Sequence, residues 1–232
     1  LRNNIPDRVL KGHPWVYNNE IASIDKMAKP GDLVSVTTAQ GNFIGKGFYN
    51  PQSQIQVRIF TREEKENIDA DFFYRKVLAC WQYRQRLGYI ENCRLVFGEA
   101  DGLPSLIVDK FNDYFVIQTM SLGMDLCKQF VVQAIEKIFS PKGIYERNDV
   151  AVRELEGLEQ VKGFLSKPFP TEITIHENGL EFIVDVDKGQ KTGFFLDQQD
   201  NRREVHRIAQ DADVLEAFCY TGTFGLNAVK HG

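Results

Sequence analysis

The sequence predicts an α/β protein with a small additional β domain at its N-terminal side. Three changes of hydrophobic pattern along the 232 residues support this fold class. Up to about Arg62, apolar and polar residues alternate with the two-residue period of short strands, and from about Ala70 the period becomes helical. Near the other end, an apolar run leads into a small-residue turn and a helical pattern, which is the layout of a βα unit in a doubly wound sheet.

The first section is expected to form a β-barrel or sandwich of roughly 60 residues. Its strand candidates are residues 33–36, residues 43–48 and the alternating run through Ile55, Val57 and Ile59. Pairs of turn-forming residues punctuate these runs at Pro30-Gly31, Gly41-Asn42 and Asn50-Pro51. The charged stretch at residues 61–69 is typical of a solvated junction between modules.

A mixed α/β module is expected over residues 70–165. Its first helix carries one apolar stripe, formed by Phe73, Val77, Cys80 and Trp81. A second helix runs between Cys127 and Ile138, and the Ser140-Pro141 pair ends it. The strand candidates are residues 94–97, 106–109, 114–118 and 143–146, with Asn112-Asp113 as a hairpin turn.

A further hairpin is predicted ahead of the βα unit. Residues 173–175 and the alternating run at 180–186 flank the turn pair Asn178-Gly179. The segment KTGFFLDQQDNR (residues 191–202) follows it, and then DVLEAFCYTGTFG (residues 213–225). In the second segment we expect a strand that ends at Phe218 and a helix that begins near Thr223.

The net charge and the cysteines argue against several classes of protein, among them uniformly basic nucleic-acid binders and disulfide-rich or zinc-binding proteins. The formal net charge is −4, which argues against a uniformly basic nucleic-acid binder. Residues 1–62 nevertheless carry eight Lys or Arg and four Asp or Glu, so this section is the better candidate for phosphate contact. The four scattered cysteines fit neither a disulfide framework nor a zinc site, and no apolar stretch is long enough for a membrane helix. A cytoplasmic protein is expected.

The turn in FCYTGTFG has the chemistry of a cofactor site. Gly222 permits close approach of a ligand to the backbone, and the free amides of the following helix favour an electron-rich group. Glu216 would lie near the carboxyl edge of the sheet, where it could accept hydrogen bonds from an ammonium or a hydroxyl. Only Gly222 and Gly225 are present, so the GxGxxG fingerprint of a nicotinamide-dependent oxidoreductase is missing. The alternative is an ordinary βα turn without a ligand.

The Lys191 segment combines a cation, a Thr-Gly pair, two aromatic residues and a polar run. A hairpin exit followed by an amphipathic helix, with Val205, Ile208 and Ala209 toward the core, is the alternative interpretation. That alternative gives no reason for Lys191, Thr192 and Gln198 to cluster ahead of a nucleotide-type turn.

Taken with RLVFGEADGLPSLIVDKFNDYFVIQ (residues 94–118) and IYERNDVAVRELEGLE (residues 144–159), these two segments closely resemble the large-subunit ribosomal RNA cytosine C5-methyltransferases. GHPWVYNNEI (residues 12–21) resembles the opening of their PUA domain. The resemblance implies a PUA-like RNA-binding domain at residues 1–64, a central α/β domain at 65–170, and a hairpin with the start of a Rossmann-like methyltransferase domain at 171–232.

The resemblance also implies S-adenosylmethionine as cofactor and assigns residues to it. The first cofactor motif of the family corresponds to residues 216–224, where it places Glu216, Phe218, Tyr220, Thr221, Gly222 and Phe224 at the cofactor. It also places Lys191, Gly193, Phe195 and Gln198 along the cofactor or target-base side, so ten residues are assigned to the cofactor site. Two positions depart from the family pattern. Glu216 stands where Asp is usual, which alters reach, and Gln199 stands where Arg is common, which puts an ion pair or phosphate contact there in doubt.

The implied cytosine reaction needs a cysteine thiolate that adds to C6 of the base. In the family this nucleophile lies downstream of the first cofactor motif, so we expect no catalytic residue in this chain. Cys219 is expected to be a small buried turn residue instead, and Cys80 and Cys127 are expected to be core residues. The chain starts at Leu1 and stops at Gly232, and we expect it to be inactive alone for lack of the catalytic half.

For RNA contact, the candidates are Arg8, Lys11, His13 and Trp15, which place cations among aromatics. The alternative is that Trp15 is a core residue and His13 only shapes a turn. Arg147 and Arg153, interleaved with Asp149, Glu154 and Glu156, are expected to form a solvated, salt-bridged face.

The function that follows is methyl transfer from S-adenosylmethionine to a base of ribosomal RNA, with cytosine C5 as the first expectation. Methylation of guanine at N7 and a non-catalytic RNA-binding fragment are the alternatives. Ribosomal RNA is the expected partner, and the resemblance suggests a homodimer.

Overall fold

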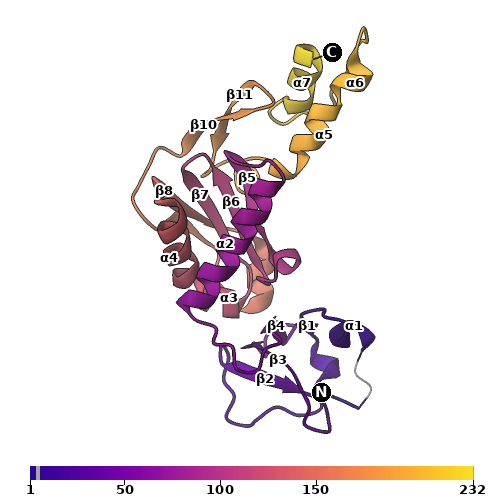
Figure 1. Ribbon diagram of the computed structural model, residues 1–232, viewed down its shortest axis with the longest axis vertical. Coiled ribbons are helices and arrows are strands. Elements are labelled where there is room, and N and C mark those ends of the chain that lie inside the picture. Colours follow the sequence, from indigo (N-terminus) through magenta and orange to yellow (C-terminus); the bar gives the residue numbers. More distant parts are fainter. Residues whose placement is uncertain (4–5, 232) are drawn as a thin grey trace.

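The computed structural model describes residues 1–3 and 6–231 of the chain. The described part is elongated, with the N-terminal β domain at one end, a central sheet in the middle, and a hairpin with the last helices at the other end (Figure 1). The predicted fold class is confirmed in its main parts. The site lies at the end formed by the hairpin and the last helices.

The N-terminal domain is a four-stranded antiparallel sheet. Its strands are β1 (Trp15–Val16), β2 (Leu33–Thr37), β3 (Phe43–Tyr49) and β4 (Val57–Thr61), in the order β1-β4-β3-β2. The short helices α1 (Asp7–Leu10) and η1 (Asn18–Glu20) flank the sheet. Inward residues such as Val16, Val36 and Ile59 form its core, so the alternation in the sequence predicted the sheet correctly. A Cβ on Gly47 would lie 2.0 Å from the backbone oxygen of Arg58, so only glycine allows this strand pairing.

The central module is a five-stranded mixed sheet. Its strands are β5 (Asn92–Phe97), β6 (Leu106–Phe111), β7 (Tyr114–Thr119), β8 (Gly143–Asn148) and β9 (Val161–Phe164), in sequential order. Only β7 and β8 are parallel, because α3 (Leu122–Leu126) and α4 (Lys128–Phe139) form the crossover between them. The short helices η2 (Gly98–Asp101) and η3 (Ala151–Glu156) lie in the connections. Strand β9 was not predicted, since its exposed edge position gives no alternation.

The two faces of the central sheet are covered by different elements. Helix α2 (Ala70–Arg86), which the carboxylate of Asp69 caps through Phe72 N–H, packs with α4 on one face. Phe115 and Ile117 of β7 point to that face, and Val116 points to the other. There the hairpin of β10 (Glu172–Glu177) and β11 (Leu180–Asp185) packs through its inward residues, as its alternation requires.

The chain after the hairpin is mostly helical. It contains η4 (Leu196–Gln198), α5 (Gln199–Glu204), α6 (His206–Ala209) and α7 (Thr223–His231). The predicted strand that ends at Phe218 is wrong, because residues 213–218 form no strand and Leu215 and Phe218 are fully exposed. A strand needs a hydrogen-bonded neighbour, and no other strand of residues 1–3 and 6–231 pairs with this segment. The helix predicted near Thr223 is confirmed.

The cysteines divide into buried and exposed. Cys80 and Cys127 lie in the core, as predicted, and Cys93 is buried as well. Cys219 was predicted to be buried, and this is wrong: the residue is exposed. Its turn does not pack under a sheet, since the strand expected before it is not formed.

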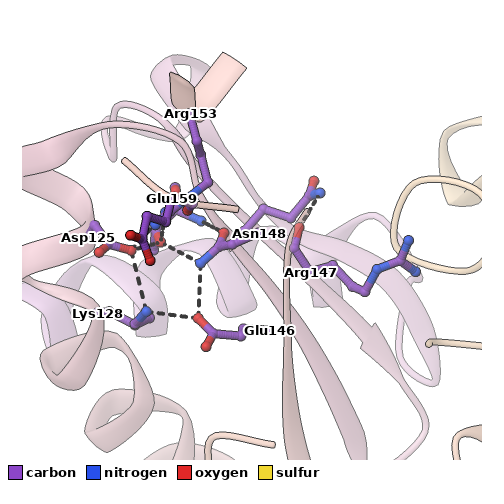
Figure 2. Close-up of polar contacts among 9 residues, drawn as sticks. Asp125, Lys128, Glu146, Arg147, Asn148, Arg153 and Glu159 are labelled. Carbon is purple, nitrogen blue, oxygen red and sulfur yellow. Dashed lines mark hydrogen bonds and ion pairs between the residues drawn. The ribbon is translucent and has the colours of Figure 1, made fainter. Parts of the chain in front are cut away.

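The face at Arg147 and Arg153 was predicted to be salt-bridged and solvated. The ion pairs are confirmed, since Arg147 pairs with Asp149 and Arg153 with Asp125, but the solvent exposure is wrong. Both side chains are buried, and so is Glu156. Figure 2 shows the polar network that compensates this burial: Arg153 donates to the carboxylate of Asp125 over 2.8 Å and to Glu159 O over 2.8 Å. Charged residues at short spacing usually mark a surface, but here Arg153 of η3 is buried against Thr119 O and Asp125, and these contacts compensate its burial.

The N-terminal domain is fixed to the central module by aromatic packing. The Phe60 ring lies 5.1 Å from that of Phe48 and 6.4 Å from that of Phe73 on α2, between ring centroids. A Cβ on Gly123 of α3 would lie 2.3 Å from Cβ of Phe48, so the two parts are in close contact.

A buried carboxylate adds a polar link across the same junction. Glu156, on η3, accepts hydrogen bonds from Asn50 Nδ2 (3.0 Å) and from Ser53 Oγ (2.5 Å). The Nη2 atom of Arg58 lies 2.8 Å from its Oε1, and the Glu156 side chain is 2% exposed. The N-terminal domain therefore has a defined orientation relative to the central sheet.

Candidate cofactor site

The Lys191 segment and the Tyr220 turn meet across one open cleft. Its volume is about 960 Å³. Seven of the ten predicted cofactor residues line it: Lys191, Phe195, Gln198, Glu216, Phe218, Tyr220 and Phe224. Gln190 and Tyr220, which are hydrogen-bonded across the cleft, lie 30 residues apart in the sequence, so the structure brings together what the sequence could only show as separate motifs.

An aromatic pair joins the two walls of the cleft. The rings of Phe195 and Tyr220 lie edge to face, with centroids 5.7 Å apart. The Tyr220 hydroxyl accepts a hydrogen bond from the backbone N–H of Gln190 over 3.1 Å. The Lys191 ammonium lies 4.4 Å from the centroid of the Phe195 ring, a cation–π distance. The cleft therefore offers aromatic surface beside a positive charge.

The cleft is also lined by the carboxylate of Asp197, which was not predicted from the sequence. Burial alone would raise the pKa of Asp197, but the hydrogen bond from Gln198 Nε2 (3.1 Å) and the charge of Lys191 lower it overall. The Lys191 Nζ atom is 4.0 Å from Asp197 Oδ1. Asp197 is thus ionised at neutral pH and can accept hydrogen bonds from a cationic or hydroxylated ligand. Its position between Lys191 and Gln198 in the motif was the available signal.

Glu216 holds the start of α7. Its carboxylate accepts hydrogen bonds from the N–H groups of Phe224 (3.3 Å) and Gly225 (2.9 Å). A Cβ on Gly225 would lie 2.6 Å from Glu216 Oε2, so glycine makes this approach possible. A negative charge at a helix N-terminus is stabilising. Glu216 also lines the cleft, and a carboxylate can accept more hydrogen bonds than these two.

The other three predicted cofactor residues do not line the cleft. Gly193 has φ +116°, and a Cβ there would lie 2.8 Å from Val184 Cγ1, so its role is to pack the segment on β11. Gly222, with φ +67°, donates to Cys219 O over 2.7 Å and forms the turn before α7. Thr221 lies in the same turn.

Three residues that line the cleft have left-handed backbone conformations. They are Lys191 (φ +53°), Phe218 (φ +58°) and Tyr220 (φ +50°). Such conformations cost energy in residues other than glycine and often occur at functional sites, where the surroundings impose them.

Arg202 is also among the residues that line the cleft, and it was not predicted either. Its side chain is 1% exposed and forms two hydrogen bonds with the carboxylate of Glu177, over 2.5 and 2.6 Å. A further bond from its Nη1 to Phe195 O, at 3.0 Å, fixes the backbone of the aromatic wall. Its position in a polar helical run gave no signal of burial.

The four predicted RNA contacts lie together at the N-terminal domain, and all four have intramolecular partners. Arg8 forms an ion pair with Glu20 and donates to Trp15 O over 2.6 Å. The indole N–H of Trp15 donates to Glu99 of the central module over 2.8 Å. The ring of His13 lies 5.1 Å from that of Trp15, and Lys11 is exposed beside Asp7. Contact between these residues and RNA stays a prediction.

The three buried cysteines are unsuited to nucleophilic attack. Burial raises the pKa of Cys80 and of Cys127 to about 12, and that of Cys93 to about 11. Their thiolate forms are therefore negligible at neutral pH. Cys219 is exposed and lines the cleft.

A comparison of the sequence with models of known protein families agrees with a cofactor site in this cleft. Residues 159–232 match the family model of S-adenosylmethionine-dependent methyltransferases. The matched region contains both walls of the cleft, which confirms the predicted cofactor at the level of the domain family. Residues 1–62 match the model of a PUA-like domain.

The chain is also similar to curated proteins named ribosomal RNA large subunit methyltransferase I. It is 42% identical over 231 residues to the one from Pseudoalteromonas atlantica, and 41% identical over 224 residues to one from Aliivibrio fischeri. These alignments include 97% and 95% of this chain but 58% and 57% of the relatives. The chain thus spans less than two thirds of their length.

Two solved structures share the fold. One is a Streptococcus mutans protein described as a SAM-dependent methyltransferase, with a TM-score of 0.82 and 19% identity. The other is described as a methyltransferase complexed with SAH, with a TM-score of 0.83 and 18% identity. Both cover all of this chain, which covers 60% and 59% of theirs. Among the helices described in residues 1–3 and 6–231, none combines the length and the apolar character that a membrane span requires.

Proposed function

We propose that this protein acts as an S-adenosylmethionine-dependent methyltransferase on a base of large-subunit ribosomal RNA. The observation that carries the proposal is the cleft itself. Two motifs that are separate in the sequence line one cavity, and both lie in the region that matches the methyltransferase family model. The names of the similar curated proteins support ribosomal RNA as the substrate.

The side chains of the cleft suit the parts of this cofactor. Phe195 and Tyr220 offer aromatic surface to a purine ring. Asp197 can accept hydrogen bonds from an ammonium or from ribose hydroxyls, and Lys191 can pair with a carboxylate. When bound, S-adenosylmethionine supplies an electrophilic methyl group.

The base that receives the methyl group is a finer part of the proposal. Cytosine C5 needs a cysteine thiolate to activate the ring, whereas guanine N7 carries its own lone pair. None of Cys80, Cys93 and Cys127 can supply this thiolate. We propose cytosine C5 on the resemblance of the motifs, with guanine N7 as the second candidate. Mass spectrometry of the modified nucleoside, as 5-methylcytidine or 7-methylguanosine, decides between them.

Ribosomal RNA would contact the PUA-like domain, where Lys11 is exposed and Arg8 and Trp15 lie close by. We propose a cytoplasmic location, which follows from that substrate. The homodimer also stays a proposal, and sedimentation of the full-length protein tests it.

A methyl-transfer assay tests the proposed function. Full-length protein is expected to move label from tritiated S-adenosylmethionine to large-subunit ribosomal RNA. Tyr220→Ala removes a ring and a hydrogen bond from the cleft and should lower kcat/KM for the cofactor by about tenfold, the equivalent of about 1.4 kcal/mol. Tyr83→Ala is the matched control, because Tyr83 is exposed on α2 and does not line the cleft.

One result would contradict the proposed function, and another would contradict the proposed cofactor site. RNA binding without any label transfer would favour the non-catalytic RNA-binding alternative. Label transfer that Tyr220→Ala and Tyr83→Ala affect equally would place the cofactor elsewhere.

A further inference from the structure

The turn that carries Lys191 is attached to the central sheet by a buried hydrogen bond. Thr192 is 0% exposed, and its hydroxyl donates to Asp109 Oδ2 over 2.5 Å. Asp109 lies on β6 and is also 0% exposed. A hydroxyl bound to a carboxylate is one of the stronger hydrogen bonds in proteins.

Asp109 is itself held by a second residue of the sheet. Arg94 on β5 donates from Nε to Oδ1 and from Nη2 to Oδ2, each over 2.9 Å. This bidentate pair fixes the plane of the carboxylate and leaves Oδ2 directed at Thr192 as well. Arg94 therefore fixes the orientation of the Asp109 carboxylate, which in turn binds Thr192 of the turn.

The start of the same turn has an independent attachment. Arg147 on β8 donates from Nη1 to Val186 O over 2.9 Å and to Gly189 O over 3.0 Å. The turn is thus held at its start by Arg147, which binds two of its backbone carbonyls, and at its end by Asp109, which binds the Thr192 hydroxyl. Between these points lies Lys191, whose φ of +53° is unfavourable unless neighbouring contacts impose it.

We propose that Asp109 is a positioning residue for cofactor binding. By accepting the Thr192 hydrogen bond it holds the Lys191 turn, so that the Lys191 ammonium stays over Phe195 and beside Asp197 at the cleft. This inference rests on the proposed function, because it assigns Asp109 a task in that same site. Asp109 is not among the residues that line the cleft, and its hydrogen bond to the turn is the one from Thr192.

Thr192→Val tests the proposal with little change of side-chain shape. It removes the hydroxyl and leaves the Arg94–Asp109 pair in place. In the full-length protein, the Kd for S-adenosylhomocysteine and the KM for S-adenosylmethionine are each expected to rise about tenfold, equivalent to about 1.4 kcal/mol. The KM for RNA should not change. Thr192→Ser keeps the donor and should restore both cofactor constants to within about twofold of wild type.

Asp109→Asn is the second variant, and Asp113→Asn is its matched control. Asp113 is an exposed aspartate at the next turn, paired with Lys142. Asp109→Asn should weaken S-adenosylhomocysteine binding at least as much as Thr192→Val does, because it also removes the charged partner of Arg94. Adding Thr192→Val to Asp109→Asn should then weaken binding little further. Asp113→Asn should bind as wild type.

The binding results for these variants distinguish failure of the positioning role of Asp109 from failure of the proposed methyltransferase function. If wild-type protein binds S-adenosylhomocysteine and Thr192→Val binds it equally well, the positioning role is overturned and the proposed function stands. Equal losses in Thr192→Val and Thr192→Ser would also overturn it, since the hydroxyl would then not matter. If the wild type shows no saturable binding, the proposed function fails, and the positioning role fails with it.

Discussion

Replacing Arg202 by methionine is expected to destabilise the hairpin and α5 by about 3–5 kcal/mol, because the change leaves the Glu177 carboxylate buried without its partner. Both side chains are nearly inaccessible, at 1% and 0% exposure. The same guanidinium bonds Phe195 O, so the aromatic wall of the cleft should loosen too. Native-state hydrogen exchange over residues 172–204 measures the effect locally, which matters in a chain of several parts.

Arg203→Met is the matched control for this substitution. Arg203 is the neighbouring arginine, but its ion pair with Asp200 is solvent-exposed, and exposed pairs contribute little to stability. Hydrogen exchange should therefore change little in Arg203→Met. Equal exchange rates in the two variants would show that the Arg202–Glu177 pair does not hold this end of the molecule.

Replacing Glu156 by glutamine is expected to weaken the junction between the N-terminal domain and the central sheet by about 3–5 kcal/mol, again because a buried charge loses its partner. Glutamine cannot neutralise Arg58, whose side chain is 10% exposed. The N-terminal domain should then unfold separately and at lower temperature. Calorimetric melting would show the separate transition, and small-angle scattering would show whether the domains move apart.

Glu154→Gln serves as the control for the junction. Glu154 lies two residues away on the same short helix, is exposed and accepts a hydrogen bond from Gln160. Its substitution should leave melting and scattering unchanged. A Glu156→Gln protein that melts in one unshifted transition would mean that the packing of Phe48 and Phe60 fixes the domain without the carboxylate.

Local periodicity was enough to predict most of the fold. The inward residues of β10 and β11 alternate because every second side chain faces the central sheet, and the stripe through Phe73, Val77 and Cys80 repeats with the helical period. Such patterns are set within a few residues. The prediction of a strand at residues 213–218 was wrong for the opposite reason. A strand forms only where a neighbouring strand supplies hydrogen bonds, and this neighbour cannot be read from the residues of the segment itself.

Polar pairs between residues far apart in the sequence could not be predicted either, because each partner gives no local sign of the other. The sequence places Glu177 25 residues before Arg202, and Glu156 lies about 100 residues after Asn50 and Ser53. A charged residue in a polar run carries no local sign that its partner will be buried with it. The cleft was predicted in part, since the motifs supplied Lys191, Phe195 and Tyr220, but Asp197 was identified only by its contacts.

The central claim is that S-adenosylmethionine binds in the cleft between the Lys191 segment and the Tyr220 turn. Alkylation of Cys219 tests it most directly, because this cysteine lines the cleft and is exposed, while Cys80, Cys93 and Cys127 are buried. Burial also raises the pKa of those three thiols to about 12, about 11 and about 12, so they serve as unreactive internal references near pH 8.

Iodoacetamide labelling of the full-length protein, followed by peptide mass spectrometry, gives the rate at Cys219. We predict that S-adenosylhomocysteine slows this rate in a saturable way, with the half-maximal concentration equal to its Kd. An unchanged rate at Cys219 in the presence of excess S-adenosylhomocysteine would contradict the account.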